Sequence, residues 1–201
     1  MAIPRRSAPT RERLVAAARQ LFGETGYAGT STRAIASRAG CNVSLIKHYF
    51  GNKDGLLRAV LIEGVTTVGD ELRALDASPE PATARIERFI GFMVEHFDRS
   101  GDLMRIVDRQ LLQKKEPILE EARAIARTNM DLLAAILSDL RREHRLRRLD
   151  PRMAAVLLMG MIKFYFAAYP LTSRLVGRRS PAVLASLKRH VRQVFLEGVL
   201  R

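Results

Sequence analysis

Apolar side chains recur at every third or fourth position along most of the chain, which is the spacing of a helix with one buried face. No segment alternates convincingly between apolar and polar residues in the way of a half-buried strand. The pattern therefore predicts an all-α fold of about nine helices. The apolar stripes that carry this prediction lie within residues 14–22, 35–39, 56–61, 86–97, 103–111, 118–140, 153–169 and 183–199.

Polar caps and prolines mark where several of these helices begin. We expect the first helix to end at Gly23 and the fourth to continue to about Leu75, before the turn-rich residues 76–81. The predicted starts are Thr10, Asn52, Pro117, the pair Asp150-Pro151 and the pair Ser180-Pro181.

Residues 31–53 contain two short apolar stripes with a glycine between them. Ile35, Ala36 and Ala39 lie on one face of the first helix, and Gly40 can adopt the left-handed conformation that ends it. This spacing is typical of a helix-turn-helix.

The second helix of this hairpin spans about residues 43–50, with Asn42 as its cap and Ile46 and Phe50 as its inward pair. A recognition helix places its first turns in the major groove, where short side chains allow close approach and a cation reaches phosphate or guanine. An ordinary helical hairpin with a solvated polar face has the same spacing, so both interpretations stay open at this point. The residues left on the outward face are Val43, Ser44 and Lys47.

A longer set of residues around the hairpin is typical of a known family. It comprises residues 16–22 (AAARQLF), Gly26-Tyr27, Thr30-Ser31, Ile35-Ala36, Ala39-Gly40, residues 49–53 (YFGNK) and Leu56-Leu57. Through these residues the first sixty positions resemble, without a gap, the TetR family of bacterial transcriptional regulators.

The resemblance implies a three-helix DNA-binding domain with named contact positions. The positions that match base-facing ones in the family are Arg33, Val43, Ser44 and Lys47, those that match phosphate-facing ones are Thr32, Tyr49 and Lys53, and His48 is included with them as a candidate. The family usually has an aromatic residue at the position of Lys47 and a histidine at that of Tyr49. The operator sequence therefore cannot be carried over to this chain.

The charge of the chain agrees with a polyanionic partner. The formal net charge is +13, and residues 1–60 hold ten Lys and Arg against three Asp and Glu. A basic composition alone would also fit RNA or a membrane surface, so the motif decides between these partners. A lone cysteine, Cys41, excludes an intramolecular disulfide, and no secretory signal follows Met1, so we expect a cytoplasmic protein.

The second half of the chain is predicted to form a helical domain over residues 57–201, after a DNA-binding domain over residues 1–56. Residues 153–169 are apolar on nearly every side except at Lys163. A membrane span is the alternative, but the length is marginal and the lysine is near the centre, so we expect a helix buried on both faces. With the last helix, it resembles the carboxy-terminal pair that builds the dimeric four-helix bundle of the family.

Asn129 is a polar amide on an apolar stripe, between Ile125 and Leu133. A buried amide needs partners, which are either neighbouring groups of the chain or a ligand in an apolar cavity. His96 has the same two interpretations. Methionine and aromatic residues at helical spacing are core by default, but a pocket lined by them would be adaptable. The candidate ligand-binding residues are Met93, Phe97, Met104, Val107, Asn129, Leu133, Phe164 and Tyr165.

The function predicted from these features is that of a transcriptional regulator, a repressor released from a pseudo-palindromic operator by a small molecule. The partners are a double-stranded DNA operator, a second copy of the chain bound through the last two helices, and an unidentified effector. The alternative is a helical carrier or interaction protein without regulatory DNA binding. The four histidines are scattered, and no phosphate loop or nucleophile elbow occurs, so we expect no catalysis, metal or cofactor.

Overall fold

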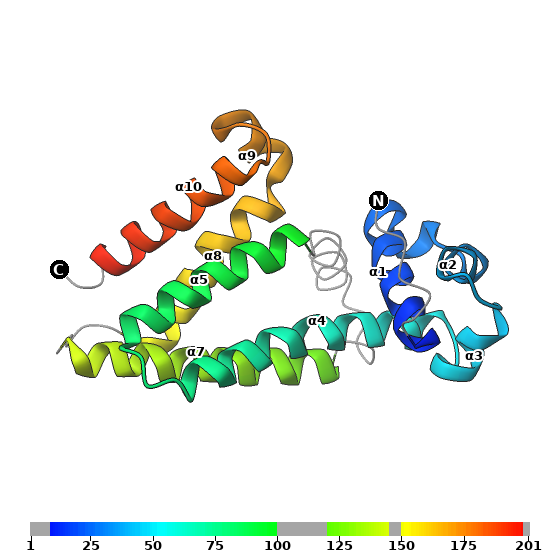
Figure 1. Cartoon of the computed structure of the whole chain (residues 1–201), viewed down its shortest axis with the longest axis horizontal. Coiled ribbons are helices and arrows are strands. Elements are labelled where there is room, and N and C mark those ends of the chain that lie inside the picture. Colours follow the sequence, from blue (N-terminus) through cyan, green and yellow to red (C-terminus); the bar gives the residue numbers. More distant parts are fainter. Residues whose placement is uncertain (1–8, 100–119, 145–149, 199–201) are drawn as a thin grey trace. The chain divides into compact units, whose positions relative to one another are not determined.

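The computed structural model describes residues 9–99, 120–144 and 150–198, and helices make up nearly all of them (Figure 1). No strand occurs in these three ranges, so the all-α prediction is confirmed. The predicted helix at 103–111 and the predicted helix start at Pro117 lie outside the described residues. The helices are α1 (Thr10–Gly29), α2 (Thr32–Ala39), α3 (Ser44–Phe50), α4 (Lys53–Asp76), α5 (Ala82–Arg99), α7 (Glu120–Glu143), α8 (Pro151–Ala167), α9 (Tyr169–Val176) and α10 (Pro181–Arg192), and a π-helical turn (Gln193–Glu197) follows α10.

Two of the predicted caps hold the helices that they precede. The Asp150 carboxylate accepts hydrogen bonds from the backbone N–H groups of Arg152 and Met153, at 2.9 and 3.3 Å. The Ser180 hydroxyl accepts one from the N–H of Val183, at 3.3 Å. Each cap satisfies donors that have no partner within the helix, so α8 and α10 begin where the sequence predicts.

The first helix differs from its prediction at both ends. Thr10 is already inside α1, after Pro9, and its side chain makes no capping hydrogen bond. Gly23 is buried within the helix, which continues past it to Gly29 with a kink at Gly26, where φ is 76°. The helix ends at Thr30 instead, whose buried hydroxyl donates to the carbonyls of Leu21 and Gly26.

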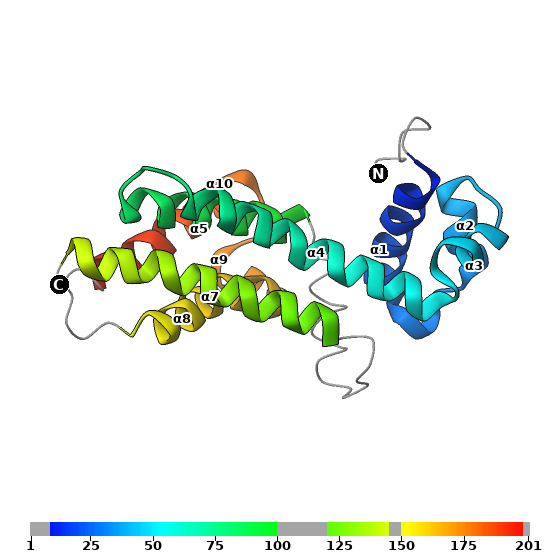
Figure 2. The same ribbon diagram turned by 90° about the horizontal axis from the view of Figure 1, so that it is seen from below.

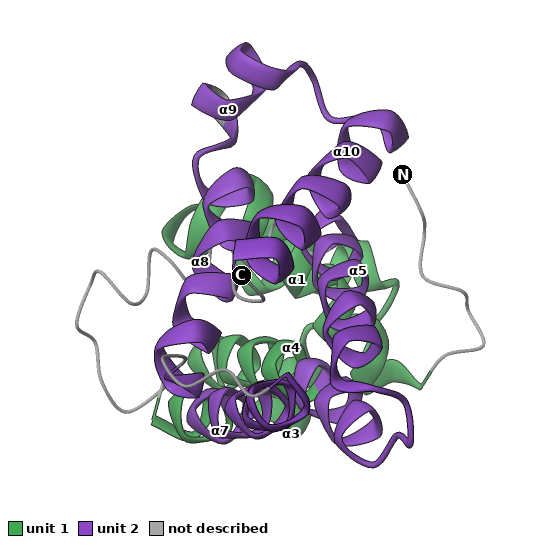
Figure 3. Ribbon diagram, turned by 90° about the vertical axis from the view of Figure 1, so that its left-hand side faces the viewer, with its two compact units in different colours: residues 1–66, 101–125 green, residues 67–100, 126–201 purple. Residues whose placement is uncertain are grey.

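The chain divides into two compact units (Figure 3). Of the described residues, the first unit holds 9–66 and 120–125, and the second holds 67–99, 126–144 and 150–198. Both α4 and α7 contribute to each unit. The predicted boundary between a DNA-binding domain and a second domain at residue 56 stays a prediction.

The core of the first unit is made of small and medium apolar side chains from α1 to α4, together with Ala122 of α7. This core explains the three-and-four spacing of the hairpin, because each short helix can bury only one narrow stripe. Its buried members are Leu14, Val15, Ala17, Ala18, Leu21, Phe22, Ile35, Ala36, Ala39, Ile46, Leu56, Leu57, Val60, Leu61 and Ala122.

In the second unit, α5 contacts α8 and α10, and α8 contacts α9 and α10. Figure 3 shows α5, α8 and α10 grouped in this unit. Figure 2, like Figure 1, shows α7 running beside α4. There Gly69 of α4 leaves room for the Asn129 amide, since a Cβ at that glycine would lie 2.6 Å from the amide oxygen. The apolar stripe predicted for α5 is buried, as expected: Ile86, Phe89, Ile90, Met93 and Phe97.

The prediction of a helix over 153–169 buried on both faces is wrong for the single chain. The helix ends at Ala167, and Ala168, with φ −96° and ψ 26°, separates it from α9. Ala155, Leu158 and Ile162 are buried, but a second face of α8 is not covered. No described helix is both long enough and apolar enough to cross a membrane. The large apolar side chains exposed on this face and on α9 are Met153, Val156, Leu157, Phe164, Leu171, Leu175 and Val176.

Candidate nucleic-acid interface

The turn between α2 and α3 is built by local hydrogen bonds. The Ser31 hydroxyl accepts from the N–H of Ala34 at 3.1 Å and so caps α2. Gly40 ends α2 in the left-handed conformation, with φ 63° and ψ 43°, as its position predicts. The side chain of Asn42 then accepts from the N–H of Ser44 at 2.9 Å. Short-range groups therefore set the entry of α3, and the turn needs no long-range partner for its shape.

Cys41 follows this glycine and is half-buried. Its N–H donates to the Ala36 carbonyl at 3.0 Å, which completes the helix end. Burial raises the pKa of the thiol, and the nearby charge of Arg13 opposes this increase. A thiol with a raised pKa is mostly protonated at neutral pH, which agrees with a packing role for Cys41.

The outward face of α3 is separated from its buried face as the periodicity predicts. Ile46 is buried and Phe50 is half-buried. The exposed side chains include two large hydrophobic ones, Val43 and Tyr49, which is unusual for this unit. The predicted DNA-binding residues that are exposed are Arg33, Val43, Ser44, Lys47, His48 and Tyr49, whereas Thr32 is half-buried.

The cations on this face differ from three other cations of the unit, which are paired with carboxylates. Arg38 makes two hydrogen bonds to Glu24, at 2.9 and 3.0 Å, and Arg19 and Arg58 pair with Glu63 and Glu121. In contrast, Arg33 and Lys47 make no ion pair with any residue in the described ranges. Two unpaired cations beside small side chains form a surface that can accept a polyanion at little desolvation cost.

Lys53 occupies a different position from the one that the sequence suggests. Its ammonium donates to the backbone carbonyls of Tyr27 and Thr30, at 2.8 and 2.9 Å, and lies 4.1 Å from the centre of the Tyr27 ring. The start of α4 is thereby tied to the end of α1. Two of the three ammonium donors are used within the chain, so Lys53 has a structural role here.

The Tyr27 hydroxyl completes this contact by donating to the Asp54 carboxylate. Burial and that hydrogen bond raise the pKa of the Tyr27 phenol, so the phenol stays a donor throughout the neutral range. The sequence shows that Tyr27 and Asp54 are polar residues near helix ends. It does not show that they meet, because 27 positions separate them.

Exposure separates one of the described candidate ligand-binding residues from the others. Met93, Phe97, Asn129, Leu133 and Tyr165 are buried. Phe164 is 62% exposed, so its prediction as part of an interior cavity is wrong for this chain: it lies on the uncovered face of α8. His96 is half-buried and stacks on Phe92. Met104 and Val107 lie outside the described residues.

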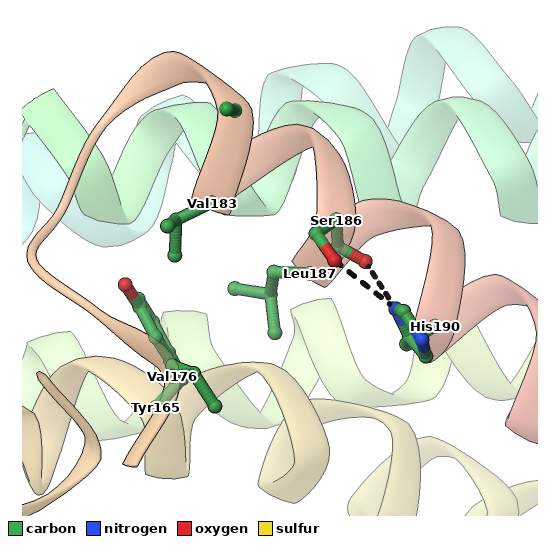
Figure 4. A pocket seen from close by; sticks show the side chains of 7 residues that line it. Tyr165, Val176, Val183, Ser186, Leu187 and His190 are labelled. Atoms are coloured by element: carbon green, nitrogen blue, oxygen red, sulfur yellow. Dashed lines mark hydrogen bonds between the residues drawn. The ribbon is translucent and has the colours of Figure 1, made fainter. Parts of the chain in front are cut away.

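A pocket of about 410 Å³ lies in the second unit between α8, α9 and α10 (Figure 4). Among the candidates in the described ranges, Tyr165 alone contributes to it. Sequence reasoning missed the rest: it assigns Val183 and Leu187 to the apolar stripe of the last helix, and no local signal marks the other lining residues. The lining residues are Tyr165, Val176, Ala182, Val183, Ser186, Leu187 and His190. No group of His, Cys, Asp or Glu able to hold a metal ion was found among the residues with described positions.

Comparisons with known proteins connect both units to one family. Residues 14–60 match the family model for bacterial regulatory proteins, tetR family, and residues 79–167 match that for the tetracyclin repressor-like C-terminal domain. The HTH-type transcriptional regulator BetI 2 of Chromohalobacter salexigens is 35% identical over 91 residues, which cover 45% of this chain and 43% of that protein. The match thus spans less than half the length of this curated relative.

Two solved structures share the fold over nearly the whole chain. The fatty acid degradation regulator FadR of Bacillus halodurans is 19% identical, with a TM-score of 0.79 over 97% of this chain and 98% of that one. The transcriptional regulator FadR of Bacillus subtilis, in complex with stearoyl-CoA, is 18% identical, with a TM-score of 0.75 over 94% of this chain and 98% of that one. At these identities the likeness extends to the fold alone.

Proposed function

This chain belongs to the TetR family of bacterial regulatory proteins, and on that premise we propose that it is a ligand-responsive transcriptional repressor that binds DNA. The observation that carries the proposal is the outward face of α2 and α3, where Arg33 and Lys47 are exposed without an ion-pair partner in the described chain. Such a regulator acts on chromosomal DNA, so we place it in the cytoplasm, with neither catalytic activity nor a cofactor.

In this proposal α3 enters the major groove. Lys47 and Arg33 read or approach base edges, because a cation can donate to the acceptors of guanine, while Val43 and Ser44 allow close approach. The phosphate contacts come from Thr32 and Tyr49, with His48 beside them. Lys53 supports the phosphate contact mainly by holding the start of α4 against the Tyr27 and Thr30 carbonyls.

We further propose that the chain acts as a two-fold dimer on a pseudo-palindromic operator. A recognition helix of seven residues reads few base pairs, and a symmetric pair doubles that number. The uncovered face of α8 supports this: Met153, Leu157 and Phe164 follow one another at helical spacing. Gly160 lies between the last two and has open space around it, so another backbone could approach there.

The last helix contributes less directly to this dimer than its sequence suggests. Val191 is buried within the chain, so a charge there would destabilise the fold of the single chain and would not test the dimer contact. Leu187 is half-buried and lines the pocket. Among the apolar side chains of this last segment, Val194 is strongly exposed and is a better candidate for a dimer contact.

The effector in this proposal is a mostly apolar small molecule that binds the second unit and lowers operator affinity. The FadR neighbour of Bacillus subtilis holds stearoyl-CoA, which supports a ligand with a large apolar part. The ligand must bind the DNA-incompetent arrangement more tightly, and a coupling of about 1–3 kcal/mol changes affinity roughly 5- to 150-fold. By reciprocity, saturating operator must weaken effector binding by the same factor.

Selection of bound duplexes from sheared genomic DNA by the purified chain, followed by sequencing, tests the proposal. We expect enrichment of a two-fold symmetric site, and affinity for it that falls steeply with salt. The double variant Arg33→Ala/Lys47→Ala serves as the matched control, because both side chains are exposed and their loss should leave the fold intact. A wild-type protein that enriches no sequence, or that enriches the same fragments as the double variant, contradicts the proposal.

A further inference from the structure

The Tyr165 hydroxyl is a buried polar group that the fold leaves without a hydrogen bond. Tyr165 lies near the end of α8 and is 6% exposed, and its oxygen has no hydrogen-bond partner. A buried hydroxyl without a partner costs about 1–3 kcal/mol, so native structures rarely keep one without a reason. Figure 4 shows the phenol ring among the residues that line the pocket between α8, α9 and α10, with the hydroxyl at its tip.

The other polar groups of the pocket already have partners. The Nδ1 atom of His190 donates to the backbone carbonyl of Ser186 at 2.8 Å and lies 3.3 Å from the Ser186 hydroxyl (Figure 4). The remaining walls are apolar side chains of α9 and α10, namely Val176, Ala182, Val183 and Leu187. The pocket thus combines mostly apolar walls with a buried polar group that has no partner, the Tyr165 hydroxyl, and this composition is usual for a small-molecule site.

The charges nearest to the phenol balance one another. Arg179 pairs with Asp98 at 3.2 Å, and the neighbouring Tyr169 hydroxyl accepts from the N–H of Arg179 at 2.9 Å. Burial raises the pKa of Tyr165, so the phenol is protonated and can donate. A neutral hydrogen-bond acceptor suits these surroundings, because Arg179, the cation that acts on the phenol, is already paired with Asp98.

We propose that the pocket between α8, α9 and α10 binds a neutral, mostly apolar small molecule through a hydrogen bond from the Tyr165 hydroxyl to an acceptor such as a carbonyl oxygen. The pocket volume of about 410 Å³ lies within the range of small-molecule sites, roughly 300–1,000 Å³. This site differs from the interior set around Met93 and Asn129, because neither of these two residues lines it and its walls come from α8, α9 and α10. Its regulatory meaning rests on the proposed function, but the binding itself does not.

Two probes that differ in one acceptor test the hydrogen bond: 2-acetylnaphthalene, which has a carbonyl oxygen, and 2-ethylnaphthalene, which has none. Equilibrium dialysis of the full-length wild type and of Tyr165→Phe gives four dissociation constants. We expect the substitution to weaken 2-acetylnaphthalene relative to 2-ethylnaphthalene by about 3- to 10-fold, since one neutral hydrogen bond is lost. Tyr165→Phe should fold normally, because it removes only an unpaired oxygen.

Tyr169→Phe is the matched control, since it removes the same group from a neighbouring tyrosine that does not line the pocket. It should leave the ratio of the two dissociation constants unchanged. Val183→Trp fills the pocket and should weaken both probes at least about 10-fold. If both probes bind Val183→Trp as well as the wild type, they bind elsewhere and the proposal is wrong.

An unchanged ratio in Tyr165→Phe would show that the hydroxyl bonds only water, and this also overturns the proposal. If neither probe binds to a dimeric wild type, the pocket is filled in the dimer, and the proposal is overturned. Operator binding without probe is measured in parallel. Loss of probe binding with intact operator binding rejects this site alone, whereas probe binding without operator binding rejects the proposed function.

Discussion

The two units differ in the kind of side chain that they leave exposed. In the described part of the first unit, the large hydrophobic side chains that are strongly exposed are Val43 and Tyr49, both on the face of α3. The second unit exposes several large apolar side chains on α8, and it also exposes Leu171 and Leu175 on α9. It also buries a charge, because Arg85 is 5% exposed and pairs with Asp139 at 2.7 Å.

This contrast distinguishes two modes of association. Exposed cations remain solvated until a polyanion replaces their counterions, so the first unit can stay complete while it is free. An exposed apolar face costs free energy until another apolar surface covers it, so this face of the second unit favours association. In our proposal the partners are DNA and a second copy of the chain.

The largest effect should come from a charge on the apolar face of α8. Leu157 is 58% exposed, and Leu157→Glu would bury an unpaired carboxylate in the proposed dimer. We expect a monomer in sedimentation experiments and a loss of operator affinity of about 100-fold or more, since the two recognition helices are no longer linked. Ala135→Glu, at an exposed position of α7, is the control and should stay dimeric. A wild type that is monomeric at micromolar concentration would refute this picture of the second unit.

The buried charge of the second unit should affect stability next most strongly. Burial tends to raise the pKa of Asp139, but the hydrogen bonds from Arg85 and Arg142 outweigh it, so the pKa is lowered. Asp139→Asn leaves Arg85 buried without its counter-charge, and we expect a loss of about 2–3 kcal/mol in the free energy of unfolding.

The pH dependence of this loss has a definite sign. Because the folded pKa of Asp139 is depressed, its contribution is present above the ordinary carboxylate value of about 3.9 and disappears as the pH falls through the folded value. The difference between wild type and Asp139→Asn should therefore shrink below about pH 4 in urea titrations. Glu63→Gln, which affects an exposed ion pair, should cost less than about 1 kcal/mol. Equal losses in the two variants would show that burial of Arg85 adds nothing.

Within the first unit, alanine variants of Lys47 and Lys53 should distinguish a residue that reads the operator from a residue that supports the fold. Lys47→Ala should keep the wild-type stability within about 0.5 kcal/mol and cost about 1–3 kcal/mol of operator binding, with relaxed sequence preference. Lys53→Ala should weaken all sequences alike and lower the free energy of unfolding by about 2 kcal/mol, because two charged hydrogen bonds to the Tyr27 and Thr30 carbonyls are lost.

Urea titrations and binding to a series of operator variants measure both properties. The paired Arg38 offers the comparison, since Arg38→Ala removes a cation that already has a partner, Glu24. If Lys47→Ala and Lys53→Ala behave identically across operator variants, the division between reading and support is wrong.

The smallest expected effect concerns two glycines of the second unit with opposite surroundings. A Cβ at Gly69 would lie 2.6 Å from the buried Asn129 amide oxygen, whereas a Cβ at Gly91 would meet nothing within 4 Å. Gly91→Ala should stabilise by about 0.5–1 kcal/mol through helix propensity, and Gly69→Ala should destabilise by about 1 kcal/mol despite it. Thermal unfolding of the two variants is the measurement. A gain in Gly69→Ala would show that Asn129 moves aside freely.

The sequence by itself determined the hairpin and most of the helices, although not the break between α8 and α9. Apolar spacing, the caps Asp150 and Ser180, and the left-handed glycine at position 40 act within a few residues, so one sequence suffices to predict them. The outward face of α3 follows from the same local spacing. The misplaced end of α1 shows the limit of such signals: a glycine can be buried within a helix, and Gly23 is.

Tertiary structure decided what depends on partners far along the chain. Lys53 meets carbonyls 23 and 26 positions away, and Arg85 meets Asp139 after 54 positions, so no local pattern shows that these charges are satisfied. The same holds for α8, whose sequence is apolar all round although its neighbours cover only one side. The unpaired Tyr165 hydroxyl is likewise invisible in the sequence, because a missing hydrogen bond is a property of every group packed around it.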